Sequence, residues 1–471
     1  MVVLFFYMSY VLFVYLFLQT IDNRNFNSWI VSFFIISIFS LIVQLYILKK
    51  IKIKLFSLTG IFLIFSYLFH LGQVPLYCIN YDFKILNLLE WGGSDLLCKA
   101  LEYSLFVCLM MFAGIILTAK KTCYGKAISN VNTNPQLVDT NNIKRIGYVL
   151  LALTLPIEIY LKTLLFIKGT TQGYMQIFSN QASGVITYFG SLYLVAVFLL
   201  MIAYKDKIWI PKMIYGLTVI LNFVYMLSGS RATSIITILI ISFFYIRCIS
   251  KISLKLVLRV AIISLLLLFA LNVIRDFRTE GISNLNVFTN YKNNLFLSFL
   301  EEMGSTLYSV MFPFISTSEP ALGATYLKGF SEILINVGGI FDSWVYGSRY
   351  MTVFYGTGAY GGSYIGELYY NFLQYGIFVS PLVGILINSI SNRIENGINN
   401  ERYLDLAALI PVFSVAIWWN RDYFVSFIRP FFWMYFIIWL LKQLLLKKVA
   451  KVTKNNDLKI TSTNSIKTKE S

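Results

Sequence analysis

The chain has 471 residues, of which 58% are apolar and only 13% are charged, and its formal net charge at pH 7 is +17. Soluble domains carry about 45–50% apolar and about 25% charged residues, so this chain lacks the polar surface of a water-soluble protein. Disorder is excluded because disordered chains are poor in aromatic residues, and this one has 40 Phe and 32 Tyr. The apolar residues run for about twenty positions at a time, as membrane-spanning α-helices do, and do not alternate as in a β-barrel. An all-α polytopic membrane protein is predicted.

The apolar stretches predict about twelve membrane-spanning helices. In chain order they are expected at about residues 2–19, 29–47, 55–77, 101–118, 146–167, 185–204, 213–227, 232–246, 256–274, 363–389, 404–419 and 424–441. The first stretch lacks the basic lead and the small-residue cleavage site of a signal peptide, so we expect it to be retained. Residues 1–446 are therefore predicted to form an integral membrane domain, and residues 447–471, which are rich in Lys, Thr, Asn and Ser, a disordered basic tail.

Basic residues orient the bundle, because Lys and Arg accumulate in the cytoplasmic loops of membrane proteins. With the N-terminus inside, the inner loops and the tail hold about two thirds of the 39 basic residues, and most of the acids fall outside. Both termini are therefore predicted to be cytoplasmic. The basic charges are spread over several loops and the tail, which argues against a nucleic-acid partner and for contact with membrane lipids.

One outer connection, from Arg275 to Gly362, is far longer than the others. It contains an apolar stretch from Asn294 to Ile315 that carries Glu301 and Glu302. This pattern predicts a helix that lies on the membrane or dips into it. Long ordered loops usually carry function, so we expect an outward-facing site covered by this loop.

Ionisable residues near membrane depth are functional candidates, because they are costly to place there. The first cluster is Leu227-Ser-Gly-Ser-Arg231, in which glycine and serine allow a tight turn before a helix that begins with Arg231. A guanidinium beside the backbone N–H groups of a helix start forms an anion site. The alternative is an arginine that reaches to the lipid headgroups from the end of a span.

The second cluster is Arg275-Asp-Phe-Arg278, directly after the ninth expected span. Two arginines three positions apart share a helical face. Both could hold one pyrophosphate, because a guanidinium matches phosphate oxygens with two hydrogen bonds. The alternative is an interfacial pair neutralised by Asp276 and Glu280.

The third cluster opens the tenth expected span with two glycines and a serine, followed at helical spacing by Glu367, Tyr370, Asn371 and Gln374. Glu367 and Asn371 are one turn apart, so they are expected to face the same way. A carboxylate beside aromatic and amide groups suits a sugar hydroxyl, from which the acid could take a proton. The alternative is a packing motif built on small residues.

The fourth cluster is Trp418-Trp-Asn-Arg-Asp-Tyr423, followed by Arg429, between the last two expected spans. Arg421, Asp422 and Arg429 are candidates for binding substrate. The alternative is that Trp and Tyr serve as interfacial anchors and that Arg421 simply pairs with Asp422.

Other signals point to structure more than to chemistry. Glu158 and Lys162 are four apart in the fifth span and are expected to form an intramembrane ion pair. His70 is the only histidine and no cysteine pair has CxxC spacing, so neither a metal site nor a Ser-His-Asp triad is expected. Cys78 and Cys98 border the second outer loop and are candidates for a disulfide. No GxxxxGK[ST] motif supports ATP-driven transport.

Residues 215–385 resemble the O-antigen, or oligosaccharide repeat-unit, polymerases of bacterial envelopes. The resemblance consists of Ser228-Gly-Ser-Arg231 opening a span, the long outer loop, and Gly361-Gly-Ser-Tyr-Ile-Gly-Glu-Leu-Tyr-Tyr-Asn-Phe372 followed by Gly376. The family usually has a glycine directly after Asn-Phe, whereas Leu373 and Gln374 stand there in this chain.

The resemblance implies a glycosyltransferase C-like enzyme of the bacterial plasma (inner) membrane that needs no cofactor, metal or nucleotide. Its substrates would be glycans linked to undecaprenyl diphosphate, taken up on the outer face, and a chain-length regulator protein is the implied partner. Arg231, Arg275 and Arg278 would stabilise the leaving diphosphate, whose charge grows as the glycosidic bond breaks. Glu367 would act on the acceptor hydroxyl. The remaining pocket residues would be Tyr370, Asn371, Arg421, Asp422 and Arg429.

Three other functions are weighed against this one. A flippase of the multidrug-exporter type would handle the same lipid, but it should show duplicated halves and short outer loops. An O-antigen ligase also has a long outer loop with arginines, but it is expected to use a histidine at the outer face, and His70 lies in the third expected span. A non-enzymatic sensor or scaffold would not need a cluster of outward arginines.

Overall fold

The computed structural model describes residues 2–21, 25–84, 86–119, 140–171, 190, 192–226, 231–250, 295–331, 333, 362–440 and 443. Every regular element in these residues is a helix, so the predicted all-α class is confirmed. Among the described residues, seven helices are long and apolar enough to cross a membrane, and shorter apolar helices accompany them. Each expected span overlaps a described helix except 256–274, which lies outside the described residues. The number twelve therefore stays a prediction.

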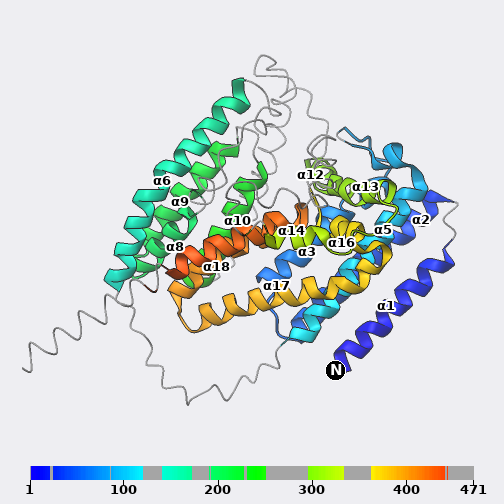
Figure 1. Ribbon diagram of the computed structural model, residues 1–471, viewed down its shortest axis with the longest axis horizontal. Coiled ribbons are helices and arrows are strands. Elements are labelled where there is room, and N and C mark those ends of the chain that lie inside the picture. Colours follow the sequence, from blue (N-terminus) through cyan, green and yellow to red (C-terminus); the bar gives the residue numbers. More distant parts are fainter. Residues whose placement is uncertain are drawn as a thin grey trace, which may run out of the picture.

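The first group of helices surrounds α5. It comprises α1 (Val2–Thr20), α2 (Phe26–Lys50), α3 (Leu58–Leu71), α4 (Val74–Cys78) and α5 (Leu88–Thr118). Figure 1 shows α1 at one edge of the molecule, and most of its large apolar side chains are exposed, as suits a helix that faces lipid. In contrast, α5 is largely buried and packs against α1, α3 and α17.

The second group is centred on α8. It comprises α6 (Thr140–Thr171), α8 (Tyr193–Ala203), α9 (Trp209–Met226) and α10 (Arg231–Cys248). Every residue of α8 is buried, and this helix contacts α6, α9, α10 and α18. In Figure 1 this group lies at the opposite end of the molecule from α1.

The ion pair predicted between Glu158 and Lys162 on α6 is confirmed. Lys162 Nζ lies 3.0 Å from Glu158 Oε1, and both side chains are mostly buried. The same ammonium donates to Asn222 Oδ1 of α9 at 2.8 Å and lies over the Tyr225 ring. The pair therefore also joins α6 to α9, which supports its structural interpretation.

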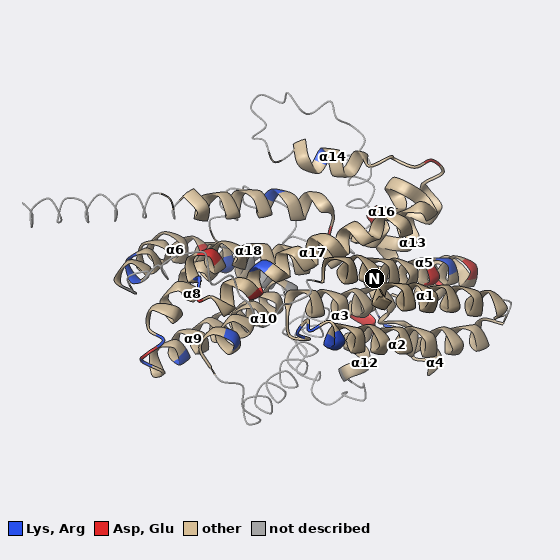
Figure 2. Cartoon of the chain, turned by 90° about the horizontal axis from the view of Figure 1, so that it is seen from below, with Lys and Arg blue, Asp and Glu red and all other residues tan. Residues whose placement is uncertain are grey.

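The C-terminal part begins with α16 (Tyr364–Phe372), η4 (Leu373–Tyr375) and α17 (Gly376–Asn399). It continues with α18 (Tyr403–Trp418), η5 (Trp419–Arg421) and a helix over Phe424–Leu440. α17 packs closely along α5. At Gly384 the two helices are so close that a Cβ would overlap the Met111 carbonyl oxygen. Figure 2 shows that few charged residues lie on the helix flanks, as expected of a bundle surrounded by lipid.

The helix predicted between Asn294 and Ile315 is present as α12 (Leu295–Gly304), η3 (Ser305–Leu307) and α13 (Tyr308–Ser316). It packs into the bundle, with α12 against α3 and α13 against α5 and α16. A further short helix, α14 (Ala324–Ser331), contacts α16. In the described part of the long loop, α13 and α14 therefore pack on α16, which carries the third cluster, whereas α12 packs on α3.

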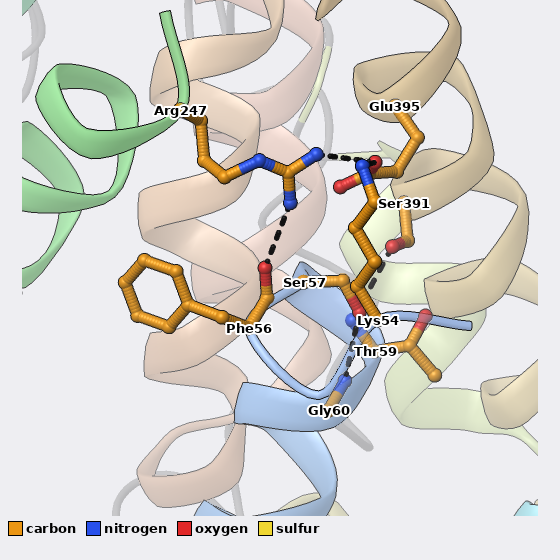
Figure 3. Close-up of polar contacts among 8 residues, drawn as sticks. All are labelled: Lys54, Phe56, Ser57, Thr59, Gly60, Arg247, Ser391 and Glu395. Atoms are coloured by element: carbon orange, nitrogen blue, oxygen red, sulfur yellow. Dashed lines mark hydrogen bonds and ion pairs between the residues drawn. The ribbon is translucent and has the colours of Figure 1, made fainter. Parts of the chain in front are cut away.

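A polar clamp joins α10, α17 and the connection before α3 at the ends predicted to be cytoplasmic (Figure 3). Arg247 of α10 lies 2.6 Å from Glu395 Oε2 of α17 and donates to the Phe56 carbonyl at 3.1 Å. Lys54 contacts the same carboxylate at 3.1 Å. The clamp fixes the inner end of α10 against the segment that leads into α3.

The candidate disulfide between Cys78 and Cys98, which the sequence leaves open, is not formed in this structure. The Cys78 thiol lies 3.8 Å from the Ile30 carbonyl of α2, to which it donates. Cys98 is buried within the packing of α5.

Candidate functional site

The site begins at the residue that starts α16. The Ser363 hydroxyl accepts hydrogen bonds from the backbone N–H groups of Ile365 and Gly366, at 3.0 and 3.3 Å. Such a cap satisfies N–H groups that have no partner within the helix, so a serine at this point favours a helix beginning at Tyr364. Gly366 packs on the Ser309 backbone of α13, where a Cβ would overlap the carbonyl oxygen. The packing interpretation of the small residues therefore holds for this glycine.

Glu367 and Asn371 share the face of α16 that α14 covers, as predicted, and both are fully buried. The Asn371 side chain donates to Thr325 Oγ1 at 2.6 Å and accepts from the Thr325 backbone N–H at 3.3 Å. Glu367 Oε2 accepts from the Phe424 backbone N–H at 2.7 Å. This arrangement ties α16 both to α14 and to the start of the last described helix.

One carboxylate oxygen of Glu367, Oε1, has no hydrogen-bond partner in the part of the chain that the structure describes. The Thr325 hydroxyl accepts from the Asn371 amide, which leaves its own hydrogen free to interact with the Glu367 carboxyl group. A buried acceptor without a donor costs free energy, about 1–3 kcal/mol for a neutral group and more for a charged one. The unpartnered lone pairs of the buried Oε1 atom therefore mark a place where a hydroxyl could donate.

The turn after α18 brings Arg421 and Asp422 to the same region. The Gly362 backbone N–H donates to the Arg421 carbonyl at 3.0 Å, which joins this turn to the start of α16. Burial raises the pKa of the Asp422 carboxyl to about 6, although the Tyr423 N–H, the Ser426 hydroxyl and Arg421 lower it. The structure describes both Arg421 and Asp422 and shows no salt bridge between them, although the charge of Arg421 still acts on the carboxyl group.

Two more predicted residues lie nearby. Tyr370 packs against Tyr423 together with Phe312 of α13. Arg429 lies one to two turns into the helix that starts at Phe424, and its Nε atom is buried without a partner among the described residues. The structure thus gathers Glu367, Tyr370 and Asn371 of α16 with the turn that carries Arg421 and Asp422. The roles of these residues remain predictions.

The arginines expected to hold the diphosphate are only partly placed. α10 begins at Arg231, as predicted, but residues 227–230 and the Arg231 side chain lie outside what the structure describes. Arg275 and Arg278 also lie outside the described residues. Their proximity to Glu367 stays a prediction.

The sequence predicts no role for His70, yet this side chain lies against the cap of α16. It is fully buried, and its Nε2 lies 2.6 Å from Ser363 Oγ while its Nδ1 lies 2.8 Å from the Ser66 carbonyl. The Ser66 hydroxyl in turn donates to Asn420 Oδ1 at 2.7 Å. The contact between His70 and Ser363 joins residues 293 positions apart. No local pattern in an apolar span signals such a partner.

Comparison with known families gives one match. The family model described as O-antigen polysaccharide polymerase Wzy matches residues 1–454, a range that contains every described helix. No curated protein and no solved structure matches the chain. Because the family model spans nearly the whole chain, including α16 and the turn beside it, the chain belongs to the O-antigen polysaccharide polymerase Wzy family.

Proposed function

We propose that this polymerase joins oligosaccharide repeat units carried on undecaprenyl diphosphate, on the outer face of the plasma membrane. Family membership supports polymerisation of O-antigen repeat units as the reaction. The observation that carries the site is Glu367, a buried carboxylate with one oxygen unpartnered among the described residues and with Asn371 and the Asp422 turn beside it. Such a group can accept a hydrogen bond, and then a proton, from a sugar hydroxyl.

The proposed reaction transfers the growing glycan from its carrier to the next repeat. The acceptor hydroxyl oxygen attacks the anomeric carbon, the bond from that carbon to the diphosphate oxygen breaks, and the hydroxyl proton passes to Glu367. The products are a glycan longer by one repeat and undecaprenyl diphosphate. The leaving diphosphate holds the energy of the linkage, so no step of the proposal uses a nucleotide or a metal ion.

Charge that develops on the leaving diphosphate is assigned to the arginines. Arg231, Arg275 and Arg278 would bind its oxygens, and a guanidinium at a helix start adds to the helix dipole. Donors placed where charge develops stabilise the transition state more than the ground state. Tyr370, Arg421 and the residues around them would hold the sugars, and a chain-length regulator would act on the length of the product.

Access to Glu367 requires a movement of the long loop. The segment 321–331 covers α16 through the Thr325 contacts with Asn371 and a backbone bond from Leu322 N–H to the Asn371 carbonyl at 2.9 Å. Loops that cover an active site commonly open to admit substrate and close to exclude water. In the proposal the acceptor enters when this segment lifts from α16.

The proposed orientation can be tested with reporter fusions. Alkaline phosphatase is active only after export, so we expect it to be inactive when fused at residue 450 and active when fused within 275–362. The reason is the excess of Lys and Arg in the loops assigned to the cytoplasm. An active fusion at residue 450 would contradict the orientation and, with it, the outer location of the site.

A deletion strain tests the function against its rivals. We expect envelope glycan with single repeat units in place of a ladder, because one unit can still be transferred when polymerisation fails. The lipopolysaccharide or capsule pattern on a gel gives the answer. Absence of even the single-unit product would favour a flippase, and accumulation of lipid-linked polymer would favour a ligase.

A further inference from the structure

The hydrogen bonds of Ser363 determine which form of His70 is present. The Ser363 oxygen has two lone pairs, and the N–H groups of Ile365 and Gly366 occupy both. The hydroxyl can therefore only donate across the 2.6 Å contact, so His70 Nε2 accepts. The Ser66 carbonyl can only accept, so Nδ1 carries the proton. His70 is thus a neutral imidazole whose two nitrogens are both engaged.

His70 and Ser66, one turn apart on α3, each contact a segment that positions the Glu367 carboxylate. His70 fixes Ser363, the cap of α16, and the Glu367 backbone N–H donates to the Ser363 carbonyl at 2.9 Å. Ser66, one turn earlier on α3, holds Asn420. Asn420 belongs to the turn that leads to Phe424, whose N–H binds Glu367 Oε2. The position of the carboxylate thus depends on α3 through two separate hydrogen bonds.

We propose that His70 is a positioning residue for the transfer reaction: it fixes the Ser363 cap and, through it, the first turn of α16 with Glu367. This inference rests on the proposed function, in which Glu367 receives the acceptor proton. His70 itself is fully buried and has protein partners at both nitrogens, so it is given no contact with substrate. The property of the imidazole ring that this role requires is a hydrogen-bond acceptor at Nε2, which accepts from the Ser363 hydroxyl.

The chain offers a matched control at the other end of α3. Thr59 Oγ1 donates to Asn388 Oδ1 of α17 at 3.0 Å, and both residues are fully buried. This bond joins α3 to the same continuous segment that carries α16, but far from Glu367 along it. Thr59→Val removes the hydroxyl and keeps the shape, so it reports what losing a buried α3 contact does to packing alone.

The test compares polymerisation rates of purified variants, supplied with the lipid-linked repeat, at equal protein level. His70→Gln keeps an acceptor, so we expect a rate within about threefold of the parent. His70→Phe removes the acceptor, and we expect a loss of roughly 10–10²-fold in turnover, with little change in KM, because small displacements of reacting groups cost factors of this size. Ser363→Ala should lose at least as much, because it removes the cap of α16 together with the His70 contact, and the double variant should lose no more than Ser363→Ala alone. Thr59→Val should keep the parent rate.

Each other outcome overturns the inference. Equal loss from His70→Gln and His70→Phe would make His70 a proton-transferring group, because an amide cannot take a proton. Normal turnover from His70→Phe would reduce its role to packing, as would an equal loss from Thr59→Val. Additive losses in the double variant would show that the two residues act separately. If Ser363→Ala does not accumulate in the membrane, Ser363→Thr keeps the hydroxyl and should keep the rate.

The proposed function and this inference can fail separately. Glu367→Gln in the same assay reports whether the carboxylate is needed at all. Reduced turnover in Glu367→Gln together with normal turnover in His70→Phe would contradict only the role proposed for His70. Normal turnover in Glu367→Gln would show that the carboxylate is not needed for the reaction. It would contradict both the proposed function of Glu367 and the positioning role of His70.

Discussion

Glu367→Gln is expected to convert the glycan ladder into single repeat units while the protein stays in the membrane at its normal level. The amide has the same shape, and its oxygen can still accept from the Phe424 N–H, but it cannot take the proton of the acceptor hydroxyl. A positioned general base contributes about 10²–10⁴-fold to a rate. The ladder on a gel and an immunoblot of the membrane fraction measure the two quantities.

Glu319→Gln is the control for this change. Glu319 is an exposed carboxylate in the long loop that precedes α16, and the proposal gives it no part in the reaction. We expect its ladder to match the parent. A full ladder from Glu367→Gln at normal expression would show that Glu367 is not the base.

The second large effect is expected at Arg231, the first residue of α10. Arg231→Ala should reduce polymerisation by about 10²–10³-fold, the usual cost of removing one donor from a place where charge develops. Arg231→Lys keeps the charge but loses the planar pair of donors, so it should retain little activity. Chain length on a gel, at matched protein level, provides the measurement.

Arg247→Lys tests the specificity of that effect, since Arg247 lies at the opposite end of the same helix. A lysine there can still pair with Glu395 in the clamp of Figure 3, so a normal ladder is expected. If Arg231 only anchored the helix in the headgroups, Arg231→Lys would also give a normal ladder. That result would remove Arg231 from the site.

The sequence predicts the membrane helices well because their cause is local. A helix needs about twenty apolar residues to cross a bilayer, and such runs are visible without knowledge of the fold. The ends are predicted less well. α5 starts at Leu88, where Asn87 caps it, whereas the apolar pattern places the start near residue 101. The prediction is late because Glu90, Asp95 and other polar residues in the first turns lower the local hydropathy.

The span expected at 363–389 shows a second kind of error. The structure interrupts it between α16 and α17, where Leu373 has a positive φ of 50°. This residue stands where the related family usually has a glycine, which adopts such a conformation more readily. Because leucine is apolar, the pattern of apolar residues gives no sign of the break at this position.

Within the site, the sequence could predict neighbours on one helix but not partners from distant segments. The spacing of Glu367 and Asn371 predicts their common face, since residues four apart are one turn apart. Their partners Thr325 and Phe424 come from other segments, 46 and 57 positions away. The partner of Ser363 is more distant still, and only the packing of α3 against this region brings His70 to it.

Polymerisation by the purified protein tests the central claim most directly. The protein would be reconstituted in liposomes with an undecaprenyl-diphosphate-linked repeat from its own cell envelope, without nucleotide sugars. We expect a ladder of lipid-linked products, with one undecaprenyl diphosphate released for each new glycosidic bond. Products that stay at one repeat, with no diphosphate carrier released, would contradict the account.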